Sequence, residues 1–279
     1  RQFLTLFVYV SPPSEEKDKI RLKNLWKNGK HEFITRLDVP LYERDGYKVP
    51  EREVLLKNPN KVYLGNSLYH HVRYGYRYGN RLYLGVTMEK DAGEPFGSYG
   101  NKGYDAYSFH FLLRDCGILH TLALGDYRLG FGEGLVVNTD FSFGKSALFN
   151  MNDRPTTIKK FSSTSETSFF RGAAASLRLG DWDVSAFYSY LPTDATLRKN
   201  GNISTLKTDG LHRTLLELSK KHNVVEQSAG GDVTWHARYF SLGMTALYEH
   251  FSRSFEKGDQ LYRSYYPEGQ DFLNASTHY

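Results

Sequence analysis

The sequence predicts an all-β protein, and more specifically an antiparallel up-and-down transmembrane β-barrel of which about ten strands are visible. Three observations lead to this fold class. The composition is rich in aromatic residues, apolar and polar residues alternate along many segments, and very short turns alternate with long connections. Each observation is weak alone, but together they describe a sheet with one apolar face.

The composition favours strands and argues against transmembrane helices. Of the 279 residues, 21 are Tyr and 18 are Phe, whereas only 9 are Pro and 3 are Met. Aromatic residues are enriched in strands. Charged residues make up 24% of the chain and the mean hydropathy is −0.54, which fits neither a disordered chain nor a helical membrane protein. No window offers the roughly 18 consecutive apolar residues of a spanning helix.

A period of two marks four β-hairpins. In the first, residues 71–79 carry aromatic side chains at even positions and basic ones at odd positions, and a short turn at 79–81 leads into an apolar alternation over 82–88. The other three hairpins span residues 107–137, 173–190 and 233–248. A change of phase near Gly125 indicates a β-bulge in the second of them.

Further elements complete the expected order. Residues 33–39 alternate like a strand, and residues 3–10 form a less polar candidate strand. Two helices are expected, the first at 14–28 between a Ser14 cap and Gly29. The second, at 209–221, carries leucines at helical spacing inside a long connection and could line or partly plug the mouth of a barrel.

Connections between the hairpins are long, covering about 92–106, 138–168, 193–226 and 252–279. Outer-membrane barrels show this asymmetry because tight turns face the periplasm and long loops face outside. Closure is expected because hydrocarbon offers no partner to an open sheet edge. The face toward lipid would carry Tyr74, Tyr76, Tyr78, Trp182, Tyr188, Tyr190, Trp235 and Tyr248.

Residues 1–279 are expected to form a single domain that is a fragment of a larger barrel. The apolar run at 3–10 lacks the basic region and cleavage site of a signal peptide, which suggests a mature or truncated N-terminus. The last residues, 274–279, are mostly polar, so the chain is expected to stop inside a loop.

Four segments also resemble a known family when they are taken together and in this order. They are Glu89–Phe96, Leu124–Leu135, Phe143–Ala147 and Gly210–Thr214. They resemble the barrel region of outer-membrane-associated proteins of the competence-type helix-hairpin-helix family, over roughly residues 30 to 250. The resemblance implies a barrel in the bacterial envelope. The helix-hairpin-helix segment itself is absent here, so the DNA-binding role of that module is not carried over.

Charged residues on the polar face are candidates to line a lumen. These candidates are Arg73, Arg77, Glu89, Arg114, Asp126, Glu133, Arg178, Asp183, Asp232, Arg238 and Glu249. They could select solutes electrostatically, as charged pore linings do. They could equally pair with one another across neighbouring strands and hold the sheet together without any solute. Gly125 and the glycines at 130–134 are interpreted as bulge and packing residues.

Motifs for catalysis or for a cofactor are weak. Gly144-Lys145-Ser146 lacks the first glycine of a phosphate loop, because position 139 is Thr139. His70 and His71 are adjacent, so on a strand they face opposite sides and cannot share a metal. The lone Cys116 excludes an internal disulfide. We therefore expect no cofactor and no enzyme activity.

The expected function is that of a channel, transporter or surface scaffold in the outer membrane of a Gram-negative bacterium. Its expected partners are outer-membrane lipid and a solute or macromolecule that passes the barrel. The alternatives are a barrel scaffold for DNA binding or uptake, with nucleic acid unsupported in this fragment, and a membrane-bound hydrolase. A soluble β-sandwich or lipocalin-like barrel also stays open, because alternation alone does not tell whether lipid or protein covers the apolar face.

Overall fold

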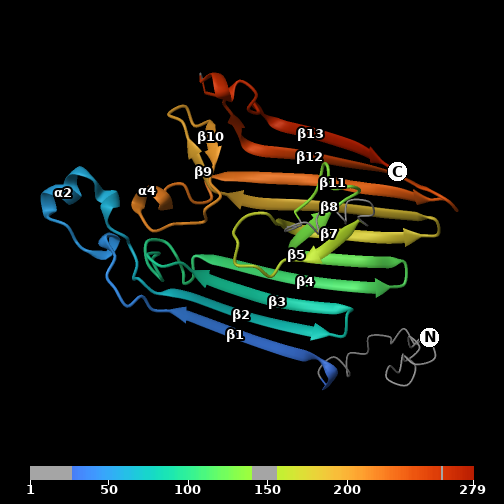
Figure 1. The fold of residues 1–279 in the computed structure, drawn as a ribbon, viewed down its shortest axis with the longest axis horizontal. Coiled ribbons are helices and arrows are strands. Elements are labelled where there is room, and N and C mark those ends of the chain that lie inside the picture. Colours follow the sequence, from blue (N-terminus) through green and yellow to red (C-terminus); the bar gives the residue numbers. More distant parts are fainter. Residues whose placement is uncertain (1–26, 140–155, 259) are drawn as a thin grey trace, which may run out of the picture.

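One large, mostly antiparallel β-sheet dominates the structure (Figure 1). The computed structural model describes residues 27–139, 156–258 and 260–279. Within these ranges the sheet contains 13 strands, and its main path runs β1-β2-β3-β4-β5-β7-β8-β11-β12, with β13 beside β12. The all-β prediction is therefore confirmed. The predicted strand at 3–10, most of the predicted helix at 14–28 and the Gly144-Lys145-Ser146 segment lie outside the described residues.

The strands of the main path are β1 (Lys30–Asp38), β2 (Tyr69–Tyr78), β3 (Leu82–Lys90), β4 (Ala106–Cys116), β5 (Leu119–Gly130), β7 (Phe170–Leu179), β8 (Trp182–Thr193), β11 (Val224–His236), β12 (Ser241–Phe255) and β13 (Gly269–His278). Three short strands accompany them, β6 (Thr157–Lys160), β9 (Ala195–Leu197) and β10 (Ile203–Leu206). The main-path strands have 9 to 15 residues, long enough for a tilted crossing of an apolar layer.

Short turns and long connections segregate to opposite ends of the sheet. The four predicted hairpins are present as β2–β3, β4–β5, β7–β8 and β11–β12, joined at residues 79–81, 117–118, 180–181 and 237–240. We call this end the turn end. The long connections 39–68, 91–105, 194–223 and 256–268 lie at the other end, the loop end (Figure 1).

The two faces of the sheet have an inverted pattern of burial. Along β8, Tyr188 is 49% exposed whereas the next residue, Ser189, is 1% exposed. On β4 and β11, Phe109 and Val233 are exposed while His110 and Asp232 are buried. We call the face with the exposed aromatic and aliphatic residues the outer face and the face with the buried polar residues the inner face. A water-soluble sheet normally shows the opposite arrangement.

The sheet is not closed within the described residues. Its two edges, β1 and β13, each pair with one neighbour only, β2 and β12 respectively. Every residue of β1 is exposed, and most of β13 is exposed as well. The expectation of a closed barrel is therefore not met in the described part of the chain. The expectation that residues 252–279 form a loop is wrong, because β12 continues to Phe255 and Gly269–His278 is a strand.

The second half of β5 parts from β4 at Gly125, while its pairing with β7 continues to Tyr127. The ladder between β4 and β5 stops at the His110–Gly125 pair, and residues 127–130 pair with β6 instead. Gly125 has a φ of +85°, and a Cβ there would lie 2.2 Å from the carbonyl oxygen of Phe109. The predicted change of phase is thus present, but its cause is this departure from β4. The expected strand to Val137 ends at Gly130.

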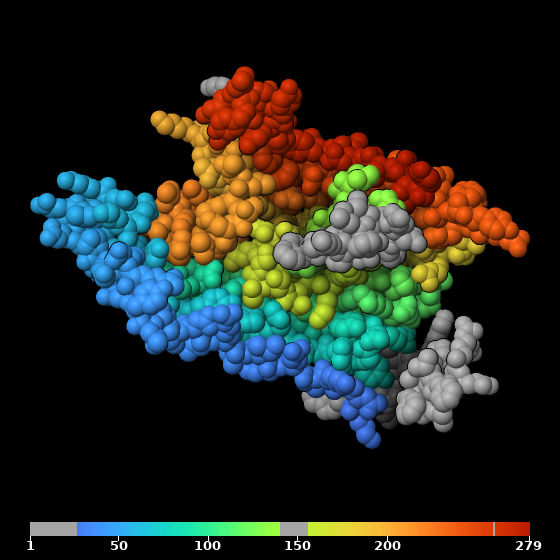
Figure 2. All heavy atoms as spheres, in the orientation of Figure 1, coloured from blue at the N-terminus to red at the C-terminus, as the bar shows by residue number. Residues whose placement is uncertain are grey.

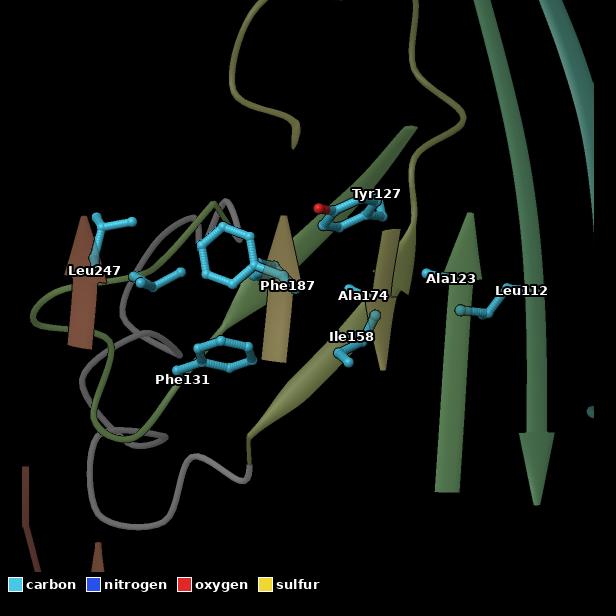
Figure 3. Close-up of a cluster of buried hydrophobic side chains, with 10 residues drawn as sticks. Leu112, Ala123, Tyr127, Phe131, Ile158, Ala174, Phe187 and Leu247 are labelled. Atoms are coloured by element: carbon cyan, nitrogen blue, oxygen red, sulfur yellow. The ribbon is translucent and has the colours of Figure 1, made fainter. Parts of the chain in front are cut away.

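This departure places residues 126–139 and 156–161, the inserted segment, against the inner face. Its apolar side chains pack on those of the sheet, as Figure 3 shows for Phe131 and Ile158 beside Phe187 and Ala174. The rings of Phe131 and Phe187 lie 5.8 Å apart. In the space-filling view, yellow-green residues that follow position 156 occupy the middle of the visible face (Figure 2). The main apolar cluster therefore lies inside the curve of β4 to β12.

Helices in the described ranges are few and short. Besides residues 27–28, which are helical, the α-helices are α2 (Arg52–Lys57) and α4 (Leu215–Leu218), and the 3₁₀ turns are Asp45–Tyr47, Pro59–Lys61 and Leu261–Arg263. The helix expected over 209–221 is only one turn long, because it starts after Thr214, which caps it together with Glu217. No helix in the described ranges is long and apolar enough to span a membrane.

Candidate functional site

Five buried or largely buried charged side chains gather where two long connections, 91–105 and 194–223, meet at the loop end. Glu94 and Asp105 lie in the connection between β3 and β4, Asp194 follows β8, and His212 and Lys221 lie between β10 and β11. We call them the loop-end cluster. Sequence separation did not indicate it, because His212 and Glu94 are 118 residues apart. The charges come together only because hairpins bring their connections to one end of the sheet.

His212 is the centre of this cluster and is 1% exposed. Its Nδ1 lies 2.5 Å from Asp105 and its Nε2 lies 2.5 Å from Asp194. Ionised carboxylates only accept hydrogen bonds, so both ring nitrogens donate and the imidazole is a cation. The backbone N–H of His212 also donates to Glu94 at 2.9 Å. Lys221 donates to Asp105 at 2.7 Å. The cluster therefore fastens the connections 91–105 and 194–223 to one another.

The pKa values of the cluster follow from burial and from these partners. Burial alone would lower the pKa of His212, but its bonds to Asp105 and Asp194 outweigh burial and raise the pKa to about 9. For Asp105, burial opposes ionisation, yet His212 and Lys221 hold its pKa below the usual value. Glu94 lies farther from the imidazolium ion, at 4.0 Å from Nδ1, and burial followed by repulsion from Asp105 raises its pKa to about 7. Burial disfavours the charged form of a carboxyl group, and a distant cation offsets little of that cost.

Three members of this cluster have the ligand types of a divalent metal site. One ligand atom from each of Glu94, Asp105 and His212 lies within 4.8 Å of the others. Carboxylate oxygens and imidazole nitrogens suit zinc. The Lys221 ammonium group occupies one oxygen of Asp105, however, and the two ring N–H groups of His212 already satisfy Asp105 and Asp194. These contacts thus suit a histidinium ion better than a metal ion.

A cavity of about 690 Å³ adjoins the loop-end cluster on the inner face. Carboxylates from several elements line it, namely Glu89, Asp105, Glu166, Asp194, Glu226 and Glu249. Its wall also includes the hydroxyl-rich stretch 163–168, which follows the inserted segment, and the side chains Thr87 and Ser108. We call it the loop-end cavity. The charged groups of its lining are predominantly acidic.

The predicted lumen residues divide between this cavity and the rest of the sheet. Glu89 and Glu249 line the cavity, and Glu89 accepts a hydrogen bond of 2.6 Å from the Tyr69 hydroxyl group. Asp126 is buried and accepts hydrogen bonds from both Nε and Nη2 of Arg171, at 2.6 and 2.9 Å. The inner face therefore carries these three carboxylates, each in a different environment.

The remaining candidates lie mainly toward the turn end. Arg178 and His236 both contact Asp183, at 3.3 and 3.1 Å, so these charges pair across strands. Arg73 is half-buried on β2, and Arg77 is exposed on the same strand. Arg114 lies over the ring of Tyr83, Arg238 lies in the β11–β12 turn over Tyr239, and Glu133 is exposed after β5. The structure does not gather them into one site.

Asp232 forms a second polar centre nearer the turn end. Three hydroxyl groups donate to it, those of Thr156, Thr234 and Thr245, at 3.0, 2.9 and 2.7 Å. The Thr234 hydroxyl also lies 3.1 Å from Nε2 of His278. In a catalytic triad the carboxylate holds the far nitrogen of the histidine. Here Asp232 holds the threonine, and Nδ1 of His278 has no partner among the described residues. This is a packing centre rather than an activated nucleophile.

Comparisons with protein-family models, with curated proteins and with solved structures find no match in any of the three. The class of this protein therefore rests on its own fold and side chains.

Proposed function

We propose that this chain forms the wall of an outer-membrane β-barrel of a Gram-negative bacterium and acts there as a non-enzymatic envelope protein. The inverted burial of the sheet is the single observation that carries the proposal. Exposed tyrosine, tryptophan and phenylalanine rings on the outer face suit contact with lipid, and buried serine, threonine and aspartate suit a polar interior.

The spacing of aromatic residues along the strands supports lipid contact. On β8, Tyr190 follows Trp182 by eight positions, or about 26 Å at roughly 3.3 Å per residue. A strand tilted by about 40° would separate these rings by about 20 Å along the membrane normal, close to the roughly 25 Å apolar band of outer-membrane barrels. Trp182 and Trp235 at the turn end, and Tyr190 and Tyr107 toward the loop end, would then lie near the two interfaces.

The two ends of the sheet support an orientation. Short turns suit the periplasmic side and long connections suit the outer side of such a barrel. The edges of β1 and β13 would pair with further strands to complete the wall, because unpaired backbone groups are costly in hydrocarbon.

The filled inner face favours a transporter or surface scaffold over an open channel. The inserted segment packs its apolar residues against β4 to β12, so this part of the interior is occupied by protein. The acidic cavity at the loop end does not favour nucleic acid inside the wall, because phosphates would be repelled. The loop-end cluster does not favour the hydrolase alternative, since both nitrogens of His212 are used by carboxylates.

Fractionation and gel mobility test this proposal. The protein is expressed behind an outer-membrane signal sequence, and the outer membrane is extracted with detergent. We expect the protein in that fraction and a change of gel mobility on boiling, as folded barrels show. A monodisperse protein that stays in the aqueous fraction without detergent would contradict the proposal. The outer aromatic face would then have to be covered by protein.

A further inference from the structure

We propose that the loop-end cavity binds a small organic cation that carries protonated amino groups. This inference deepens the proposed function by naming the chemical class of a solute. It rests on the proposed function in one respect, that the bound molecule is a solute of the barrel. Binding itself can be measured whether or not the wall lies in a membrane.

Three carboxylates of the cavity have no ion-pair partner among the described residues. They are Glu166, Glu226 and Glu249, and Glu226 accepts only a hydroxyl bond of 3.3 Å from Ser228. Glu226 and Glu249 lie on the inner face of the neighbouring strands β11 and β12. The buried Ser228 is the register partner of Glu249, and Glu226 lies two positions before Ser228 on the same face of β11. Burial raises the pKa of Glu166, which lies in a connection, to about 8. Without a cation the buried Glu166 carboxyl group avoids the cost of a desolvated charge by holding its proton, and an incoming cation would favour its ionised form.

The cavity's own basic residues are committed elsewhere. Arg171 binds both oxygens of Asp126, and Lys207 donates to the carbonyl oxygen of Leu211 and pairs with Asp209 at 2.7 Å. The protein around His222 desolvates its ring and lowers its pKa, which favours the neutral form. The three carboxylates therefore form an acidic wall that these residues do not neutralise.

Unpaired hydroxyl groups point to a ligand independently of charge. Thr87 is 3% exposed and lines the cavity, and its Oγ1 has no hydrogen-bond partner among the described residues. Its register partner on β4, Ser108, also lines the cavity and has an unpartnered Oγ. Buried hydroxyl groups normally find a partner. An amine or hydroxyl group of a bound molecule would supply it.

The spread of the carboxylates favours an organic cation over a metal ion. Among the described residues, Glu166, Glu226 and Glu249 do not form a group of ligand atoms within 4.8 Å of one another, whereas Glu94, Asp105 and His212 do. A single metal ion needs ligands that converge on one point. Separate carboxylates in a cavity of about 690 Å³ suit a molecule with amines several bonds apart.

Calorimetric titration in detergent micelles tests the inference. The probes are spermidine, a polyamine, and glucosamine, an amino sugar, which separate two sources of the same amine chemistry. N-acetylglucosamine and magnesium chloride, at matched ionic strength, are the comparators. We expect saturable binding of at least one amine and none of the comparators. The variants Glu226→Gln and Glu249→Gln should each weaken that binding about tenfold, which corresponds to about 1.4 kcal/mol.

Asp183→Asn is the matched control, because it removes an inner-face carboxylate at the turn end, where Arg178 and His236 already neutralise it. We expect unchanged amine affinity in this variant. The glutamine variants keep the shape of the side chain and remove an uncompensated charge, so they should fold, which heat-modifiable mobility verifies. Absence of saturable amine binding, equal binding of N-acetylglucosamine, or equal weakening in Asp183→Asn would overturn the inference. A protein that binds amines but stays out of the membrane would instead overturn only the proposed location.

Discussion

Asp105 and His212 lie 107 residues apart in the chain, yet Oδ2 of Asp105 is 2.5 Å from Nδ1 of His212. Asp194 closes the other side of the ring at the same distance. This single imidazolium ion ties the connection between β3 and β4 to both ends of the connection between β8 and β11 at the loop end. The cavity beside it depends on that arrangement, because Asp105 and Asp194 also line it.

Replacing His212 by Gln should destabilise the protein. The change leaves the buried Asp194 without a cation and leaves Asp105 with Lys221 alone, which costs about 3 kcal/mol. Urea unfolding in micelles at pH 6 measures this loss. His236→Gln is the control, because His236 is exposed and contacts Asp183 at the surface, and we expect a loss below about 1 kcal/mol. Equal losses in both variants would mean that His212 is not a buried ion-pair centre.

The same histidine predicts how stability depends on pH. Its folded pKa, about 9, lies above the ordinary value of 6.5, so its stabilisation is complete below pH 6.5 and declines as pH rises toward 9. The wild-type protein should therefore lose free energy of unfolding between pH 6.5 and 9, and His212→Gln should lose less over this interval. Parallel profiles of the two proteins would contradict the assignment.

The glycine at the departure point of β5 should be intolerant of any side chain. Gly125→Ala combines a left-handed backbone with a contact of 2.2 Å to the Phe109 oxygen, and we expect a loss of about 2 to 4 kcal/mol. Gly117→Ala is the control, because Gly117 also has positive φ but no atom within 4 Å of the place that a Cβ would take. It should cost about 1 kcal/mol. Urea titration compares the two variants, and equal losses would contradict a close approach at Gly125.

The pair between Asp126 and Arg171 should matter more than a surface pair. Arg171→Gln leaves the buried Asp126 carboxylate without its bidentate partner and should cost about 3 kcal/mol. Arg178→Gln, which breaks the more exposed pair with Asp183, should cost less than about 1 kcal/mol. Free energies of unfolding from one urea series test both. A larger effect at Arg178 would show that the inserted segment is not anchored by Asp126.

Chelation should leave the loop-end cluster intact. Because His212 is satisfied by two aspartates and Lys221 binds Asp105, EDTA should not change the melting temperature. Adding zinc should not raise it. A zinc-dependent rise that is lost in Glu94→Gln would instead assign the cluster to a metal.

The strands could be predicted from the sequence because each has its own alternation. Hairpins such as 173–190 carry both the apolar face and the turn residues locally, so no long-range information was needed. Strand β13 escapes such prediction for a physical reason. The outer face of this edge strand mixes the polar residues Asp271 and Thr277 with the apolar residues Leu273 and Ala275. The alternation of apolar and polar residues along the strand is therefore weak.

The loop-end cluster could not be predicted in the same way. His212 lies in the Gly210–Thr214 segment and Glu94 lies in the Glu89–Phe96 segment. Both segments belong to the four that carry the family resemblance, and this shared membership is the sequence feature that links the two residues. Nothing local identifies Asp105 or Asp194 as their partners. The helix expected at 209–221 fails for a related reason, since the backbone of His212 donates to Glu94 and the Arg213 carbonyl accepts from Leu64. Tertiary contacts replace helical ones there.

The most direct test of a lipid-facing wall is quenching of tryptophan fluorescence by brominated lipid. In a Trp26→Phe background, Trp182 and Trp235 report on the outer face, where their rings stack 6.2 Å apart. The control has both replaced by Phe and carries Phe187→Trp, which reports on the buried inner face. We predict strong quenching of the outer pair and little quenching of the inner reporter in vesicles of brominated phosphatidylcholine. Equal quenching at both positions, or none at the outer pair, would contradict contact between the outer face and lipid.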